Sequence, residues 1–164
     1  MNCAQIKIIA CGDGETRITV DGRANFEAAV PLREFVNTLA VDFRLVSVDL
    51  QKCSGMDSTF MGVLSMLGLK ARKCGADVVM VNTSDSNIGL LKGLGVAKLF
   101  RFVIEDTPLD DVSAPEEAKS AANMLETART VLEAHQTLMD VDEENVGKFQ
   151  QVVDFARKDV DRLK

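Results

Sequence analysis

The stretch Gly55-Met56-Asp57-Ser58-Thr59-Phe60-Met61-Gly62 decides how this sequence is interpreted. It follows an apolar, strand-like run over residues 45–50 and opens a helical pattern that reaches about Cys74. Asp57 is a good N-cap, because its carboxylate can accept hydrogen bonds from the free backbone N–H groups of a first helical turn. We therefore expect a strand, a short connection and a helix that begins beside Ser58.

Ser58 and Thr59 fall in the first turn of this predicted helix, where we expect their hydroxyls near solvent. A phosphate added there would meet unpaired N–H donors and the positive end of the helix dipole. It would also bring about −1.5 to −2 charges to one spot. The position suits a hydroxyl that is modified and then recognised by a partner. Such residues are also common at helix starts for structural reasons alone, so the stretch by itself leaves both interpretations open.

Composition indicates a folded protein with an uneven charge distribution. The chain has 164 residues, of which 46% are hydrophobic, enough for one packed domain or one domain with an appendage. Residues 1–106 contain 12 acidic and 12 basic side chains, whereas residues 107–164 contain 13 acidic and 7 basic ones. The C-terminal part therefore carries the whole net charge of −6. Neither part offers the basic face that nucleic-acid binding requires.

Several classes of site are not expected from this sequence. No apolar run approaches the roughly 20 residues of a membrane helix, and Lys7 and Arg17 interrupt the N-terminus before a signal-peptide core could form. We therefore expect a cytoplasmic protein. The four cysteines include no C-x-x-C pair and His135 is the single histidine, so we expect no metal site and no cofactor.

The first 106 residues predict an α/β domain with the order β-β-α-β-α-β-α-β. Two alternating strands flank the turn Gly12-Asp13-Gly14, and Asn25 can cap the helix that follows. Pro31 lies inside that helical pattern, so we expect a kink there or a helix that starts only near Pro31. The predicted strands are 5–11, 15–20, 44–50, 77–82 and 97–103, and the predicted helices are 26–41, 58–74 and 86–94. Such an order favours a mixed sheet with helices mainly on one side.

Residues 107–164 predict a two-helix extension of this domain. Ser113-Ala114-Pro115-Glu116 has capping-box spacing, and two amphipathic helical patterns follow it, separated near Asp140 and Asp142. Two such helices form a hairpin, which we expect to pack against the domain or against a second copy of the chain. A homodimer through the C-terminal helices is therefore one expected association. We interpret His135 as a residue of the seam between the two helices.

Two methionines near Ser58 leave an alternative open. Met61 and Met66 lie off the inward stripe of the predicted helix 58–74. They predict either a soft, exposed contact patch beside Ser58 or the filled edge of a core.

Recognisable catalytic motifs are missing from the sequence. It has no G-x-x-x-x-G-K-[ST] loop, no G-x-G-x-x-G after a strand and no G-x-S-x-G around Ser58. A Ser–His pair would require the C-terminal part, with His135, to dock onto the domain, and we discount it. We therefore do not expect an enzyme.

The element order and two motifs resemble a STAS domain of the anti-anti-sigma factor type. The family motif Asp-Ser-[Ser/Thr]-x-x-Gly is matched by Asp57, Ser58, Thr59 and Gly62. A Gly-Leu-x-x-Leu-Phe signature is met, with an ambiguity of register, by Gly93-Leu94-Gly95-Val96-Ala97-Lys98-Leu99-Phe100. The resemblance covers about residues 1–106. The family often has an aspartate before its first helix, where this chain has Asn25.

This resemblance implies a regulatory function. In the family, an anti-sigma factor with serine/threonine kinase activity phosphorylates the motif serine, and a metal-dependent serine phosphatase reverses the step. The unphosphorylated protein binds the anti-sigma factor and so frees a sigma factor. By resemblance Ser58 is the phosphorylated residue, with Thr59 as the alternative. The implied partner-binding residues are Asn25, Asp57, Ser58, Thr59, Met61 and Gly62.

Two other functions remain as alternatives at this stage. The chain can keep the STAS fold but serve as a scaffold or a small-ligand-binding subunit without a phosphoswitch. An enzyme of unknown class is the least favoured alternative. The Ser58 hydroxyl separates the first two functions, because only a phosphoswitch depends on its modification.

Overall fold

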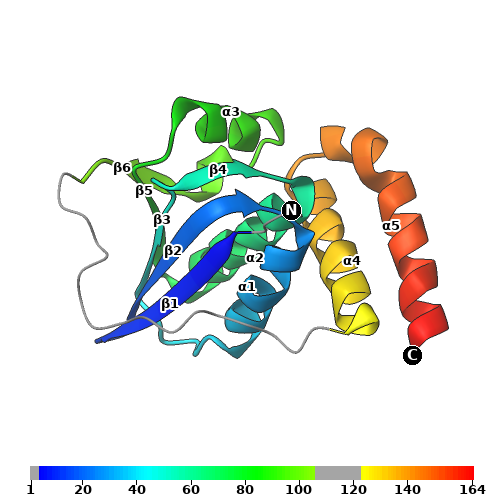
Figure 1. Cartoon of the computed structure of the whole chain (residues 1–164), viewed down its shortest axis with the longest axis horizontal. Helices are drawn as coiled ribbons and strands as arrows, with labels where there is room; N and C mark the ends of the chain where they lie inside the picture. Colours follow the sequence, from blue (N-terminus) through cyan, green and yellow to red (C-terminus); the bar gives the residue numbers. More distant parts are fainter. Residues whose placement is uncertain (1–3, 106–122) are drawn as a thin grey trace.

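A computed structural model describes residues 4–105 and 123–164 (Figure 1). The first part contains a sheet and three helices, and the second contains two long helices. The elements are β1 (Gln5–Gly12), β2 (Glu15–Ala24), α1 (Phe26–Thr38), β3 (Leu45–Asp49), β4 (Cys53–Met56), α2 (Ser58–Cys74), β5 (Asp77–Val81), α3 (Asp85–Gly93), a 3-10 turn (Ala97–Leu99), β6 (Arg101–Val103), α4 (Met124–Val141) and α5 (Glu144–Leu163). No helix in these two ranges is both long and apolar enough to cross a membrane.

The sheet is mixed, as the sequence predicted. β1 and β2 form an antiparallel hairpin through the turn at residues 12–14, and the remaining pairs are parallel. The strand order is β1-β2-β3-β5-β6, and β4 adds a short parallel pairing with β2. The strands contribute mainly aliphatic side chains to the core, among them the fully buried Ile18, Val46, Val48 and Met80.

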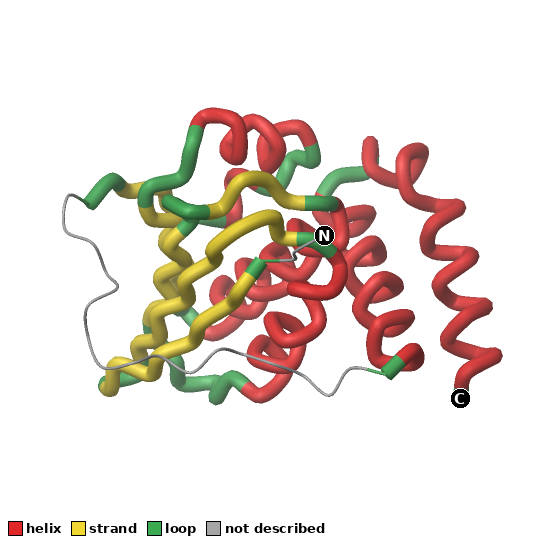
Figure 2. Tube along the Cα trace, in the orientation of Figure 1, coloured by secondary structure: helices red, strands yellow, loops and turns green. Residues whose placement is uncertain are grey.

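The helices form two further layers beside the sheet. In Figure 2, α1 and α2 stand between the strands and the C-terminal helices. α4 contacts both α1 and α2, and α5 packs on α4. α3 lies apart from these layers and contacts β4. The expected α/β sandwich with a two-helix extension is therefore confirmed, and in this structure the extension packs on the helical side of the domain.

Capping contacts define three helix ends, and the expected Asn25 cap is among them. Asn25 caps α1, since its Oδ1 accepts from the backbone N–H groups of Glu27 and Ala28 at 3.0 and 3.2 Å. Gly75 ends α2 with φ of +71°, in the left-handed region that glycine adopts without strain. Ser84 caps α3 by accepting from the N–H of Asn87 at 3.1 Å.

Some element boundaries differ from the predicted ones. α1 begins at Phe26, as predicted, and runs through Pro31, so the alternative of a helix that starts only near Pro31 is wrong. The sequence analysis missed β4, whose four residues include a serine and a glycine and show no strand-like alternation. The last strand covers only Arg101–Val103, since residues 97–99 form a 3-10 turn. The capping box predicted at residues 113–116 lies outside the described residues. Asn123 caps α4.

Candidate functional site at the start of α2

The first turn of α2 is fixed by the side chain and by the backbone of Asp57. Asp57 is its N-cap, and its Oδ1 accepts from the backbone N–H of Phe60 at 2.8 Å. The backbone N–H of Asp57 donates to the carbonyl of Ala24 at 2.9 Å, in register with the β2–β4 pairing. Since Ala24 precedes Asn25, the starts of α1 and α2 are held next to each other at the ends of β2 and β4. Ser58 is the first residue of α2.

Ser58 is half-buried, and its hydroxyl is bonded to α4. Its Oγ lies 2.8 Å from Nε2 of His135, a residue 77 positions away in the sequence. Nδ1 of the same imidazole lies 2.7 Å from the carbonyl oxygen of Val131. A carbonyl only accepts, so Nδ1 carries the proton in the neutral ring and Nε2 accepts from the Ser58 O–H.

The surroundings of His135 favour this neutral form. The side chain is only 2% exposed, and its ring meets the ring of Phe149 from α5 edge-on, with centroids 4.9 Å apart. Burial lowers the pKa of His135 below its ordinary value, against smaller opposing effects of the Val131 hydrogen bond and the Asp57 charge. His135 therefore lies in the hairpin seam, as predicted, but it also contacts the domain.

The prediction that discounted a Ser–His pair is wrong, because the hairpin does dock onto the domain. A serine that donates to a neutral histidine has the arrangement of an activated nucleophile. Here the second ring nitrogen is oriented by the Val131 carbonyl rather than by a carboxylate.

The other residues expected at the site are less accessible than predicted. Thr59 and Met61 are each only 5% exposed. Met61 therefore fills a core edge, and the alternative of an exposed contact patch is wrong for this residue; Met66 is partly buried against the same core. The expectation that Thr59 lies near solvent is therefore wrong for the residue as a whole.

At Gly62, α4 comes very close to α2. A Cβ atom at this position would lie 2.6 Å from the Cβ of Ala134 and would also collide with the backbone of that residue. Only a glycine allows the two helices to come so near each other. The glycine of the Asp-Ser-Thr motif is therefore covered by α4 in this structure.

Arg33 is a site residue that the sequence analysis missed. It is only 8% exposed, and its guanidinium holds Glu133 through two hydrogen bonds, Nε to Oε1 at 3.0 Å and Nη2 to Oε2 at 2.7 Å. Nη1 also donates to Glu126 at 3.1 Å. The hydrogen bond to Glu133 raises the pKa of the guanidinium, against the opposing effect of burial. The available signal was a cation beside the apolar stripe of α1 and two glutamates seven residues apart in α4.

The side chains of Asn145 and Lys148 fix the far end of the hairpin. Asn145 donates through Nδ2 to the carbonyl oxygens of Leu94 and Leu138, at 2.9 and 2.8 Å. Lys148 donates to the carbonyl of Gly93 at 3.1 Å. These contacts place the turn between α4 and α5 against the end of α3.

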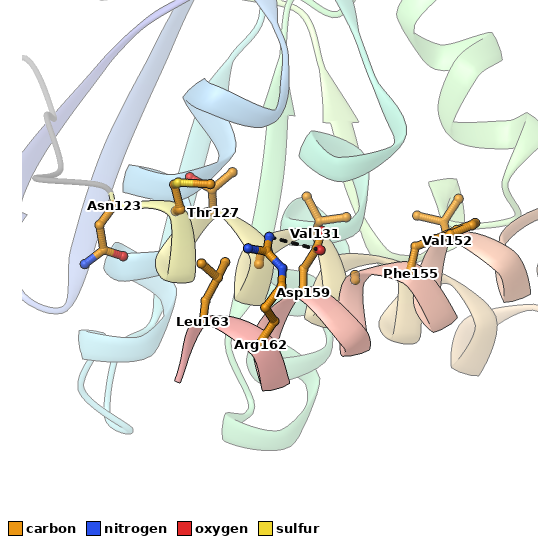
Figure 3. Close-up of a pocket in the computed structure, with 11 residues that line it drawn as sticks. Asn123, Thr127, Val131, Val152, Phe155, Asp159, Arg162 and Leu163 are labelled. Carbon is orange, nitrogen blue, oxygen red and sulfur yellow. Dashed lines mark hydrogen bonds and ion pairs between the residues drawn. The ribbon is translucent and has the colours of Figure 1, made fainter.

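The hairpin also carries an apolar groove on its own surface. This cavity of about 590 Å³ runs between α4 and α5 and is lined by Met124, Val131, Val152 and Phe155, with an ion pair between Asp159 and Arg162 at its rim (Figure 3). Ser58 is not among its lining residues, so the groove is separate from the start of α2. Among residues 4–105 and 123–164, no three His, Cys, Asp or Glu side chains gather as metal ligands would.

Comparisons with known proteins show the fold. No family model matches the chain, and no curated protein gives a significant match. The structure of the anti-sigma factor antagonist SpoIIAA in its unphosphorylated form superposes with a TM-score of 0.52 at 15% identity, over 65% of this chain and 92% of that one. The structure of the Bacillus cell fate determinant SpoIIAA in its phosphorylated form has a TM-score of 0.52 at 15% identity, over 66% of this chain and 99% of that one. The structure of a proposed anti-sigma factor antagonist from Thermotoga maritima has a TM-score of 0.50 at 15% identity, over 61% of this chain and 84% of that one. The chain has a STAS-like fold, shared with these anti-sigma factor antagonists.

Proposed function

We propose that this chain is a phosphorylation-switched regulator of the anti-sigma factor antagonist type. It acts in the cytoplasm, where it binds an anti-sigma factor with serine kinase activity and so frees a sigma factor. The fold shared with SpoIIAA supports the class of protein. The observation that carries the proposal is the place of Ser58, directly after the Asp57 cap at the start of α2.

The structure favours Ser58 over Thr59 as the residue that is modified. Ser58 is half-buried, with its hydroxyl bonded to His135 of α4, whereas Thr59 is almost fully buried. A kinase must bring the hydroxyl to a phosphate donor, and a buried threonine would require the first turn of α2 to unwind. Asp57 and Asn25 hold the adjoining helix starts in place around this hydroxyl.

Phosphorylation at Ser58 would change the charge of the whole surface. The dianion would lie at the positive end of α2, which stabilises it. It would also lie beside the carboxylate of Asp57, so about three negative charges would gather where the unphosphorylated chain has one. A partner that packs closely against the neutral hydroxyl would then have to desolvate or match these charges, and its affinity would fall by orders of magnitude. A metal-dependent serine phosphatase would restore binding.

We further propose that the Ser58–His135 pair is not catalytic. A fluorophosphonate probe, which labels activated serines, should leave Ser58 unmodified in the native chain. Labelling of Ser58 that disappears in a His135→Phe variant would instead indicate a hydrolase.

The phosphoswitch is tested in two steps. Mass spectrometry of phosphopeptides from the native cell should find phosphate on Ser58 and none on Thr59. The anti-sigma factor that co-purifies with the wild-type chain should then bind Ser58→Ala and lose binding to Ser58→Asp. Equal binding by these two variants would contradict the proposal and would favour a STAS scaffold that works without a switch.

A further inference from the structure

The hairpin covers the surface that the proposed function assigns to a partner. α4 lies against α1 and α2, where its His135 bonds the Ser58 hydroxyl and its Ala134 covers Gly62. The 2.8 Å hydrogen bond to His135 Nε2 engages the Ser58 hydroxyl, and Ala134 occupies the space directly beside Gly62. A partner and the docked hairpin therefore exclude each other.

The chemistry beneath the hairpin is specific. Removal of α4 would expose Arg33 without Glu126 and Glu133, on a face that also carries Ser58, Gly62 and apolar side chains of the core cluster. A cation on such a face is costly unless carboxylates pair with it. The geometry at Gly62 adds a second requirement, since only a small residue fits where Ala134 now lies.

We propose that the face of α1 and α2 beneath the hairpin is the chain's partner-binding surface, that it takes an acidic helix, and that α4 occupies it as an internal competitor. The partner's helix presents carboxylates to Arg33 and a small residue to Gly62, as α4 does. Opening the hairpin exposes Ser58 to a partner or a kinase. This inference rests on the proposed function only for the identity of the covered surface.

The experiment uses the full chain with two charge reversals in α4. Glu126→Lys combined with Glu133→Lys sets two cations against Arg33 and should release the hairpin. Asp154→Lys combined with Asp161→Lys makes the same charge change on exposed positions of α5 and is the matched control. Access to the start of α2 is measured in Ser58→Cys versions of these chains, from the rate at which iodoacetamide alkylates position 58 in peptide mass spectra.

The α4 reversal should raise the alkylation rate at least about tenfold. Each lost hydrogen bond to the charged Arg33 shifts the equilibrium between docked and open hairpin by about that factor. The control should leave the rate unchanged. Hydrogen exchange in β3 and β5 should remain slow in both. Unchanged alkylation after the α4 reversal would overturn the proposal. Loss of protection in the sheet together with α2 would do so as well, since the hairpin would then be an inseparable part of the core.

The acidic helix is tested in trans with a fluorescent peptide of residues 124–141. It should bind the chain with the α4 reversal at least about tenfold more tightly than it binds the wild type, because no docked hairpin competes there. The same peptide with lysine at positions 126 and 133 should not bind. An acidic-helix site would be refuted if both peptides bound the opened chain equally well. It would also be refuted if neither peptide bound the opened chain. None of these measurements uses a kinase, so they can fail while Ser58 phosphorylation stands, and the reverse holds too.

Discussion

Replacing Gly62 by alanine measures how closely α4 approaches α2. Two effects of opposite sign act at this position. Alanine favours a helix interior over glycine by about 1 kcal/mol, which by itself would stabilise α2. The added Cβ would lie 2.6 Å from the Cβ of Ala134. Two non-bonded carbon atoms cannot approach so closely, so α4 must move. Overpacking of this kind costs about 1–3 kcal/mol.

Gly147 supplies the matched control. It lies in α5, and a Cβ atom there would have no neighbour within 4 Å. Gly147→Ala gains the same helix propensity without a clash, so it should raise the free energy of unfolding by up to about 1 kcal/mol. The propensity gain cancels between the two variants. Their difference should therefore equal the cost of the clash, about 1–3 kcal/mol in favour of Gly147→Ala.

Urea denaturation of the two full-length variants measures this difference directly. In thermal melts the same gap should appear as roughly 2–12 °C, given about 2–4 °C per kcal/mol for a chain of this size. Hydrogen exchange should place the loss of protection in α4. If Gly62→Ala stabilised the chain as much as Gly147→Ala does, α4 would not lie against α2 in solution, and the account of a covered Ser58 would be refuted.

Three further predictions concern single side chains. Asp57→Ala should lower the free energy of unfolding by about 0.5–2 kcal/mol in urea titrations, because the N–H of Phe60 loses its cap; an unchanged value would show that the cap is dispensable. Glu133→Gln should cost about 1–3 kcal/mol by the same method, since Arg33 loses its charged acceptor, and Arg33→Leu with Glu133→Leu should recover part of that loss. His135 has a lowered pKa in the folded chain, so the unfolded chain binds more protons as the pH falls through about 6.5. Stability should therefore decline from about pH 7 toward pH 5 more steeply in the wild type than in His135→Phe.

The parts of the fold that could be predicted from sequence are those that local chemistry determines. The Asn25 and Asp57 caps each depend on residues within a few positions of one another. Alternation and helical stripes then fix the element order, and the order limits the sheet to few topologies. β4 escaped prediction because its strand character comes from pairing with β2, which no pattern in its own four residues shows.

The site escaped prediction for a related reason. The Ser58–His135 and Arg33–Glu133 contacts join positions 77 and 100 residues apart. Sequence patterns indicated that α4 has an apolar face, but not which surface of the domain receives it. The buried Arg33 was the one informative feature, because a cation within an inward-facing stripe needs an acidic partner from another element.

The composition of the hairpin interface explains how a docked segment can also be a releasable one. Among the buried apolar side chains of the hairpin, Ala134 and Leu138 join the core cluster of the domain, whereas Ala128, Val153, Ala156 and Val160 do not. The partly buried Val141 and Phe149 also pack against that cluster. Polar contacts complete the interface, through Ser58, Arg33 and the carbonyl groups at the end of α3. Polar contacts and a buried ion pair give precise placement but little net stability, because water satisfies the same groups when they separate. The sheet and its first helical layer keep their own aliphatic core, so the hairpin can leave as a unit at a lower cost than global unfolding.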